Sequence, residues 1–78
     1  MNARLYLIDQ HIGRRIRARR LELGLTQTAL GEALGVRFQQ IQKYERARNS
    51  LPAASLPPLA ERLGVRPDYF FEELAWPL

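Results

Sequence analysis

Cysteine is absent from this chain of 78 residues, and histidine, methionine and tryptophan occur once each. The lack of cysteine excludes a disulfide framework and a thiolate metal site. His11 alone cannot form a zinc site with scattered carboxylates, so we expect no metal and no other cofactor. No nucleophile–base pair or phosphate-binding loop is recognisable, and the adjacent Glu72 and Glu73 point apart on a helix. The sequence therefore does not predict an enzyme.

Long apolar runs are missing as well. The longest run is far below the roughly 18 residues that a membrane span needs. Residues 5–8 form an apolar segment too short for a signal peptide. We therefore expect a soluble, cytoplasmic protein with no membrane partner. A chain of 78 residues fits a single domain with a small core.

Acidic residues are few relative to basic ones, and the excess is unevenly distributed. The chain has 12 Lys and Arg against 8 Asp and Glu, a net charge of +4. Residues 1–48 contain ten basic and four acidic residues, an excess of +6, and residues 49–78 contain two and four, a balance of −2. This asymmetry favours a face that attracts a polyanion. The alternative is a set of arginine-rich helices that are simply solvated.

Alternating strand patterns are also absent, and glycine and proline separate segments with helical spacing. Ile12, Ile16 and Leu23 predict a first helix that begins at an Asp9 N-cap and ends at Gly24. Thr26 caps a predicted second helix over residues 27–34, with Gly35 as its stop. A third helix is expected from Phe38 to about Arg46.

The remaining segments follow from the positions of the prolines. Residues 47–55 lack a helical period and indicate a loop. Because proline is tolerated in the first turn of a helix, Pro57 and Pro58 predict a fourth helix from Leu56 to Leu63. Pro67 opens a fifth, which is expected to end near residue 73. The fold class is therefore all-α, a compact five-helix bundle.

Two charged residues interrupt the apolar stripes of these helices. The stripe through Ile16 reaches Arg20 one helical repeat later, and the stripe through Ile41 reaches Glu45. Opposite charges on the inward sides of two helices are most simply explained by a buried ion pair between them. We therefore predict that Arg20 and Glu45 join the first helix to the third. The alternative is that both side chains lie in water at the edges of their stripes.

The segment 25–46 contains an ordered set of short motifs. They are Leu25-Thr26-Gln27, Leu30, Ala33-Leu34-Gly35-Val36, Gln39-Gln40-Ile41 and Lys43-Tyr44-Glu45-Arg46. Upstream and downstream matches are Ile12-Gly13, Arg15-Ile16-Arg17, Arg20, Leu63-Gly64-Val65 and Asp68-Tyr69-Phe70-Phe71. Over about residues 9–72 this set resembles the lambda-repressor-like, or Cro-like (Xre), helix-turn-helix family. The resemblance implies that the second and third helices form a DNA-binding helix-turn-helix.

In such a motif the third helix, about Phe38–Arg46, enters the major groove of DNA. The residues that the resemblance implies as base-reading are Arg37, Phe38, Gln39, Gln40 and Lys43. Glutamine bonds adenine, arginine and lysine bond guanine, and a phenylalanine contacts thymine methyls. The residues implied as phosphate-binding are Gln27, Arg46, Arg48, Asn49 and Ser50. Phosphate contacts position a protein without carrying sequence information.

Three features depart from the family pattern, and one of them is the pair of prolines at 57 and 58, which shortens the fourth helix. Arg37 stands where Ser or Thr is expected as the N-cap of the third helix, and arginine caps poorly. A charge contact with DNA would compensate, so Arg37→Ser is expected to raise stability and weaken binding. Ala47 stands where glycine is frequent, which predicts a less strained or shifted backbone there.

Taken together, these features predict a sequence-specific regulator of transcription that binds double-stranded DNA, with repression as the expected effect. We expect a homodimer on an inverted-repeat operator in bacterial or phage DNA. Residues 1–8 are expected to form an N-terminal arm, 9–73 the DNA-binding domain and 74–78 an apolar tail that either folds back or meets a partner. The alternative function is an antitoxin-like or accessory module that binds another protein. RNA binding is disfavoured because Tyr44, Tyr69, Phe70 and Phe71 have the spacing of core residues.

Overall fold

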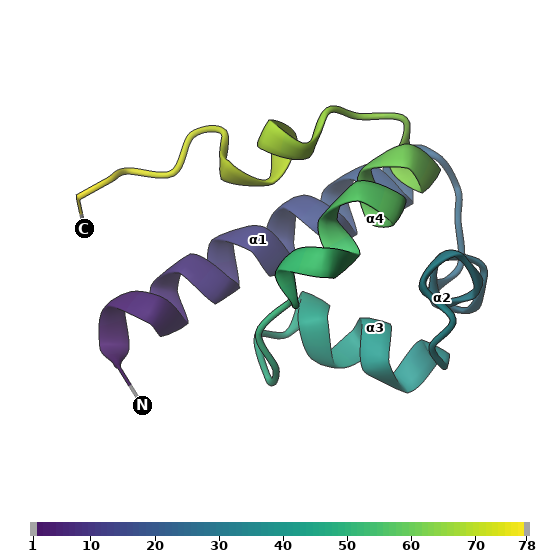
Figure 1. Ribbon diagram of the computed structural model, residues 1–78, viewed down its shortest axis with the longest axis horizontal. Coiled ribbons are helices and arrows are strands. Elements are labelled where there is room, and N and C mark those ends of the chain that lie inside the picture. Colours follow the sequence, from purple (N-terminus) through teal and green to yellow (C-terminus); the bar gives the residue numbers. More distant parts are fainter. Residues whose placement is uncertain (1, 78) are drawn as a thin grey trace.

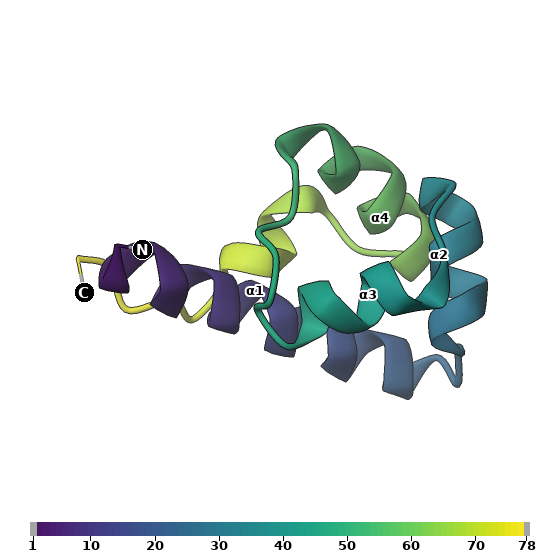
Figure 2. The same cartoon turned by 90° about the horizontal axis from the view of Figure 1, so that it is seen from below.

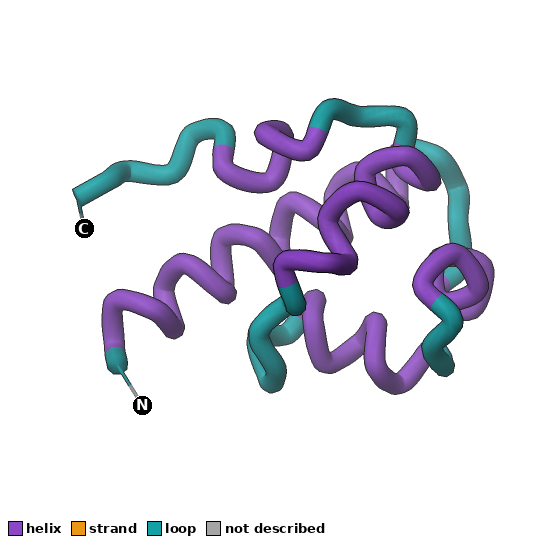
Figure 3. The backbone as a smooth tube through the Cα atoms, in the orientation of Figure 1, coloured by secondary structure: helices purple, strands orange, loops and turns teal. Residues whose placement is uncertain are grey.

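The computed structural model describes residues 2–77, and every regular element in that range is helical. Figures 1 and 3 show the order of the elements and the loops between them. The elements are α1 (Ala3–Glu22), α2 (Gln27–Leu34), α3 (Phe38–Glu45), η1 (Ala53–Ser55), α4 (Leu56–Leu63) and η2 (Pro67–Phe71). The all-α prediction is confirmed, with four α-helices and with the 3₁₀ element η2 in place of the predicted fifth helix. The 3₁₀ turn η1 lies within the predicted loop 47–55.

The first helix begins earlier than its sequence indicates. The prediction of an N-cap at Asp9 and of an arm before it is wrong, because α1 already begins at Ala3. The side chain of Asn2 caps it by accepting hydrogen bonds from the backbone N–H groups of Arg4 and Leu5, at 2.8 and 3.3 Å. Neither glycine nor proline interrupts residues 3–12, so the helix continues without a break. In Figure 2 these first turns project beyond the body that α2, α3 and α4 form.

The segment after α4 is less regular than predicted. Five residues from Pro67 form the 3₁₀ element η2, and the chain leaves helical geometry at Glu72 with φ −60° and ψ 141°. The turn is held from outside, because the Arg15 Nε–H donates to the Tyr69 carbonyl at 3.0 Å. The Arg15 guanidinium also lies 3.9 Å from the centre of the Tyr69 ring. Contacts with α1 therefore stabilise this short element.

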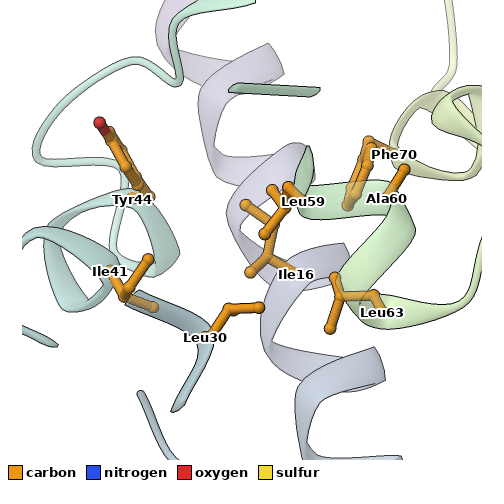
Figure 4. Close-up of a cluster of buried hydrophobic side chains, with 8 residues drawn as sticks. All are labelled: Ile16, Leu30, Ile41, Tyr44, Leu59, Ala60, Leu63 and Phe70. Atoms are coloured by element: carbon orange, nitrogen blue, oxygen red, sulfur yellow. The ribbon is translucent and has the colours of Figure 1, made fainter. Parts of the chain in front are cut away.

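The core lies where α1, α2, α3 and α4 meet (Figure 4). Its largest fully buried side chains are Phe70, Ile16, Leu30, Ile41, Leu59 and Leu63. Burying a side chain of this size contributes about 1.5–3 kcal/mol. Tyr44 is buried and Tyr69 half-buried, as their spacing suggested. Phe71 is an exception: 43% of its surface is exposed, because only one face of η2 lies against the core.

A glycine permits α1 and α3 to approach closely. A Cβ added at Gly13 would lie 2.6 Å from the carbonyl oxygens of both Tyr44 and Glu45. Real Cβ atoms do not come this close to backbone oxygens, so only glycine fits between the two helices at this point. The backbone of α1 therefore sits directly against the C-terminal turn of α3.

The segment that follows η2 turns back along α1 (Figure 1). The Arg4 guanidinium lies 4.6 Å from the centre of the Trp76 ring. Trp76 is nevertheless 59% exposed, and so is Leu5 in the first turn of α1. The apolar tail was predicted either to fold back or to meet a partner. Trp76 folds back onto α1, while Leu78 lies outside the described residues. Within residues 2–77, no helix combines the length and the apolar character that crossing a membrane would require.

Candidate nucleic-acid interface

The two sides of α3 differ sharply in burial. Ile41, Tyr44 and Glu45 are buried on the side that faces the domain. Gln39, Lys43 and Arg46 are exposed, and their spacing of four and three residues places them in one row on the opposite side. The helix therefore presents one continuous polar and basic row to solvent.

The N-terminal end of α3 adds an unusual pair of residues to this row. Arg37 has the extended backbone of an N-cap, φ −79° and ψ 161°, but its side chain makes no capping hydrogen bond. By contrast, Thr26 caps α2 by accepting from the N–H of Ala29 at 3.0 Å. Phe38, the first residue of α3, is 44% exposed. The Gln40 N–H at this helix end donates to the Arg37 carbonyl at 3.0 Å, but the Arg37 side chain caps none of the backbone N–H groups.

The turn between α2 and α3 fixes the angle at which α3 is presented. Gly35 adopts the left-handed conformation, φ 67°, and ends α2. Its neighbour Val36 packs against the core, and the Val36 N–H donates to the Gly31 carbonyl at 3.0 Å. Glycine has no Cβ and adopts the left-handed conformation readily, so Gly35 ends α2 as predicted and allows a tight turn into α3.

A buried ion pair joins α1 to α3 behind the exposed row. Arg20 Nε–H and Nη2–H donate to the two carboxylate oxygens of Glu45 at 2.6 and 2.9 Å. Arg20 Nη1–H also donates to the Leu25 carbonyl at 2.9 Å. The hydrogen bond to Glu45 raises the pKa of Arg20 above its ordinary value, while burial acts in the opposite direction and the Glu45 charge adds to the increase. Any stability linked to this shift is present at neutral pH and is lost only as the pH rises through the raised pKa.

The same carboxylate holds a residue of the candidate site. Gln27, the first residue of α2, donates from Nε2 to Glu45 Oε1 at 3.1 Å. A primary amide has two N–H donors, so one remains for a further partner. The ion pair between α1 and α3 therefore also orients Gln27 at the N-terminus of α2.

The loop after α3 contains the remaining candidate residues. Gln40 Nε2–H donates to Asn49 Oδ1 at 3.1 Å, which ties the loop to α3. Ser50 donates its hydroxyl proton to Asp9 of α1. For Ser50 to donate to a phosphate, this bond must break. Arg46 and Arg48 remain exposed.

Ala47 keeps the backbone conformation in which the family favours glycine. Its φ is 56°, in the left-handed region, so the expectation of a less strained or shifted backbone is wrong. The methyl group is only 5% exposed. Burial of the methyl group offsets part of the conformational cost, which is about 1–2 kcal/mol.

A shallow cleft lies beside the exposed row of α3. Its volume is about 260 Å³, and its lining residues are Gln42, Lys43, Arg46 and Arg48. Gln42 was missed by the sequence reasoning, because its position in the helix does not indicate that a loop arginine lies beside it. Among residues 2–77, the three cations of the cleft, Lys43, Arg46 and Arg48, form no ion pair with a carboxylate. Three arginines of α1, in contrast, pair with acidic residues: Arg15 with Glu72, Arg19 with Glu22 and Arg20 with Glu45.

Comparison with known proteins places this geometry in a family. A sequence model described as "Helix-turn-helix" matches residues 16–70, which include α2, the turn at Gly35 and α3. The chain belongs to the lambda-repressor-like helix-turn-helix family. The crystal structure of the P22 c2 repressor in complex with synthetic operator 9T, in the presence of Tl⁺, has the same fold. It is 39% identical, with a TM-score of 0.70, over 76% of this chain and 89% of that chain.

Curated relatives of this helix-turn-helix domain are regulators by name. The chain is 47% identical to an uncharacterized HTH-type transcriptional regulator of Sinorhizobium fredii, over 92% of this chain and 50% of the relative. It is 49% identical to an uncharacterized transcriptional regulator in the ATPase CF(0) region of Rhodospirillum rubrum, over 90% of this chain and 65% of the relative. Repressor protein C2 of Salmonella phage P22 is 38% identical over 81% of this chain and 29% of its own length. The chain spans about half the length of the first two Sinorhizobium relatives, 50% and 46%.

Proposed function

We propose that this domain binds double-stranded DNA with sequence specificity and regulates transcription, with α3 in the major groove. The observation that carries the proposal is the exposed row of Gln39, Lys43 and Arg46 on a helix whose other side is buried. An α-helix fits the major groove, where glutamine and basic side chains distinguish base pairs. The printed description of the P22 c2 repressor structure, a complex with an operator, supports the same partner for this chain.

Four of the proposed base-reading residues lie at the exposed N-terminal end of α3 or in its exposed row, and the fifth, Gln40, is half-buried beside them. The full set is Arg37, Phe38, Gln39, Gln40 and Lys43. In this arrangement Lys43 bonds guanine and the glutamines bond adenine, while the exposed ring of Phe38 contacts thymine methyls.

The proposed phosphate contacts lie on both sides of α3. They are Gln27, Arg46, Arg48, Asn49 and Ser50. Gln27 stands at the N-terminus of α2, where backbone N–H groups also favour an anion. Arg46 and Arg48 line the basic cleft and lack carboxylate partners within residues 2–77. Ser50 joins this set only when its hydroxyl leaves Asp9.

We further propose that two copies bind an inverted repeat and that the usual effect is repression, at DNA in the cytoplasm of a bacterium. One domain of this type covers a half-site, and a two-fold dimer matches a palindrome. The exposed Leu5 and Trp76 provide apolar surface for a contact between copies. Light scattering of the wild type and of Trp76→Ala tests this contact. A dimer mass that falls to the monomer mass in the variant supports it, and a monomer mass in both contradicts it.

The experiment that tests DNA recognition is selection of bound duplexes from a random library at moderate salt, followed by sequencing. We expect an enriched inverted repeat whose half-sites lie about one helical turn apart. The motif should be lost in Gln39→Ala and in Lys43→Ala. The matched control is Arg66→Ala, an exposed arginine beside η2, which should select the same motif as the wild type. Weak binding without any enriched motif would contradict sequence-specific recognition.

A role in binding another protein is the second candidate. It is favoured by the exposed apolar side chains at one end of the molecule, where Leu5 is 59% and Leu7 46% exposed. A partner that co-purifies with the wild type but not with Leu5→Ser would support this role. Co-purification unchanged by that substitution would remove this surface as its site.

A further inference from the structure

The hydrogen bond between Gln40 and Asn49 connects the helix proposed to read bases with the loop that follows it. Gln40 Nε2 and Asn49 Oδ1 are 3.1 Å apart, although the residues are separated by nine positions in the chain. Gln40 is half-buried, whereas Gln39 and Lys43 on the same helix are exposed. Among the described glutamines of α3, Gln40 is thus the one whose side-chain amide already donates a hydrogen bond within the domain.

The backbone around Asn49 is itself anchored to α3. The Arg48 N–H donates to the Lys43 carbonyl at 2.8 Å, and the Ala47 N–H donates to the Tyr44 carbonyl at 3.2 Å. The Ser50 hydroxyl donates to Asp9 of α1. Asn49 therefore lies between two anchored neighbours in the free domain. The backbone bonds of Ala47 and Arg48 to α3 do not involve Ser50, so they still hold the loop when the Ser50 hydroxyl leaves Asp9.

We infer that Asn49 is a positioning residue, which fixes the Gln40 amide for bidentate recognition of one adenine. The inference rests on the proposed function and names the base that this part of the site reads. Bidentate recognition needs one amide N–H for adenine N7 and the amide oxygen for the adenine N6 amino group. The bond to Asn49 uses only one of the two N–H donors of Gln40, so both of these groups remain.

The gain from this arrangement is preorganisation. Glutamine loses much rotamer freedom when it is ordered, and this loss opposes binding. Because Asn49 already holds the Gln40 amide, part of this rotamer freedom is already lost in the free domain, before it contacts DNA. The Asn49 Nδ2 group still has its donors for a phosphate oxygen, so one side chain joins a backbone contact to a base contact.

Two substitutions of Asn49 separate its role in positioning Gln40 from its role as a phosphate contact. Asn49→Ala removes both the acceptor for Gln40 and the donor for a phosphate. Asn49→Asp keeps an oxygen acceptor for Gln40 but replaces the donor by a negative charge, which phosphates repel. We therefore expect Asn49→Asp to bind every duplex more weakly and yet to keep its preference for the adenine.

The experiment measures binding to the duplex that the wild type selects and to copies in which one adenine at a time is replaced by 7-deazaadenine. This analogue lacks the N7 acceptor. For the wild type we expect a loss of affinity of about tenfold at one adenine in each half-site. Gln40→Ala should abolish that loss, Asn49→Ala should reduce it to about threefold or less, and Asn49→Asp should retain it. The matched control is Arg48→Ala, which should weaken all duplexes equally and keep the tenfold ratio.

The possible failures are distinguishable. If Asn49→Ala binds more weakly but keeps the ratio of the wild type, Asn49 is a phosphate contact only and the inference is overturned. If no 7-deazaadenine effect depends on Gln40, Gln40 does not read adenine, and the inference falls while DNA binding stands. If the wild type selects no duplex at all, the proposed function itself fails and this inference fails with it. Thermal unfolding of each variant tests whether a changed ratio of affinities for the adenine and 7-deazaadenine duplexes comes from unfolding.

Discussion

At the scale of single residues, we propose that Arg37 is placed for binding at a cost in stability. It occupies the N-cap of α3 without making the side-chain hydrogen bond that Thr26 makes for α2. Arg37→Ser should therefore raise the free energy of unfolding by about 0.5–1 kcal/mol, or the Tm by about 2–8 °C. The same change should weaken DNA binding, because it removes the cation from one of the proposed base-reading residues.

Thermal unfolding and DNA titration of Arg37→Ser check both parts of this prediction. Thr26→Ala is the matched control, since it removes a cap that is present, and it should lower stability by about 1 kcal/mol. If Arg37→Ser binds DNA as tightly as the wild type, Arg37 has no part in recognition.

Gly13 is the residue on which the spacing of α1 and α3 depends. A methyl group there would meet two carbonyl oxygens at 2.6 Å, and neither backbone can rotate away. Gly13→Ala should therefore force the helices apart and lower the free energy of unfolding by about 3 kcal/mol. Gly24→Ala is the control: Gly24 has φ 68° but open space around its Cβ position, so the expected loss is only about 1 kcal/mol. Urea unfolding measures both, and equal losses would contradict the close approach.

Periodicity and local motifs predicted the single residues that face the core, such as Ile16 and Ile41. They also indicated Arg20 and Glu45, because a charge on an apolar stripe needs a partner. They did not predict the partners of Ser50 or Gln40, because these bonds join segments 41 and 9 residues apart. Such pairings depend on how the loop lies against the helices, and a helical repeat carries no information about that.

At the scale of elements, α1 and α3 are joined by the buried pair of Arg20 and Glu45. Glu45→Gln keeps the shape of the side chain but leaves the Arg20 charge without its carboxylate. We expect a loss of about 3–5 kcal/mol in the free energy of unfolding. Arg20→Met combined with Glu45→Leu should lose less than Glu45→Gln alone, because no unpaired charge is buried.

The exposed pair of Arg19 and Glu22 supplies the matched control for that prediction. Its side chains are 27% and 60% exposed, and Glu22→Gln should cost less than about 1 kcal/mol. Urea unfolding at low temperature measures the variants. Similar losses in Glu45→Gln and Glu22→Gln would mean that the buried pair does not join the two helices energetically.

The boundaries of elements were harder to predict than their existence. Asp9 has the residue type of an N-cap, but an N-cap preference of about 1 kcal/mol does not stop a helix that Asn2 already caps. Pro67 correctly indicated the start of the last element. Its Tyr69 carbonyl accepts a hydrogen bond from Arg15 of α1, a tertiary contact that propensity does not report.

At the scale of the whole molecule, pairing of charges decides which basic residues remain for a polyanion. Arg15, Arg19 and Arg20 of α1 are paired with carboxylates inside the domain. Arg37, Lys43, Arg46 and Arg48, in or beside α3, lack such partners within residues 2–77, and so do Arg4, Arg14 and Arg17 of α1. Four of the seven unpaired Lys and Arg side chains of residues 2–48 therefore lie in or beside α3. The total net charge of +4 therefore understates the local field at α3.

This distribution of unpaired cations predicts how the salt dependence of DNA binding changes when single arginines are replaced. Each phosphate contact releases about one counterion, so the slope of log K against log salt concentration should become shallower by about 1 in Arg46→Ala and in Arg48→Ala. Arg66→Ala should leave the slope unchanged, since Arg66 precedes η2 and Figure 1 shows η2 and α3 on opposite sides of α1. Titrations of one selected duplex between about 50 and 200 mM salt measure the slopes. An equal change in all three variants would mean that the domain attracts DNA by its net charge alone, with no oriented face. A change confined to Arg46 and Arg48 would identify the basic cleft as the surface that meets the phosphates.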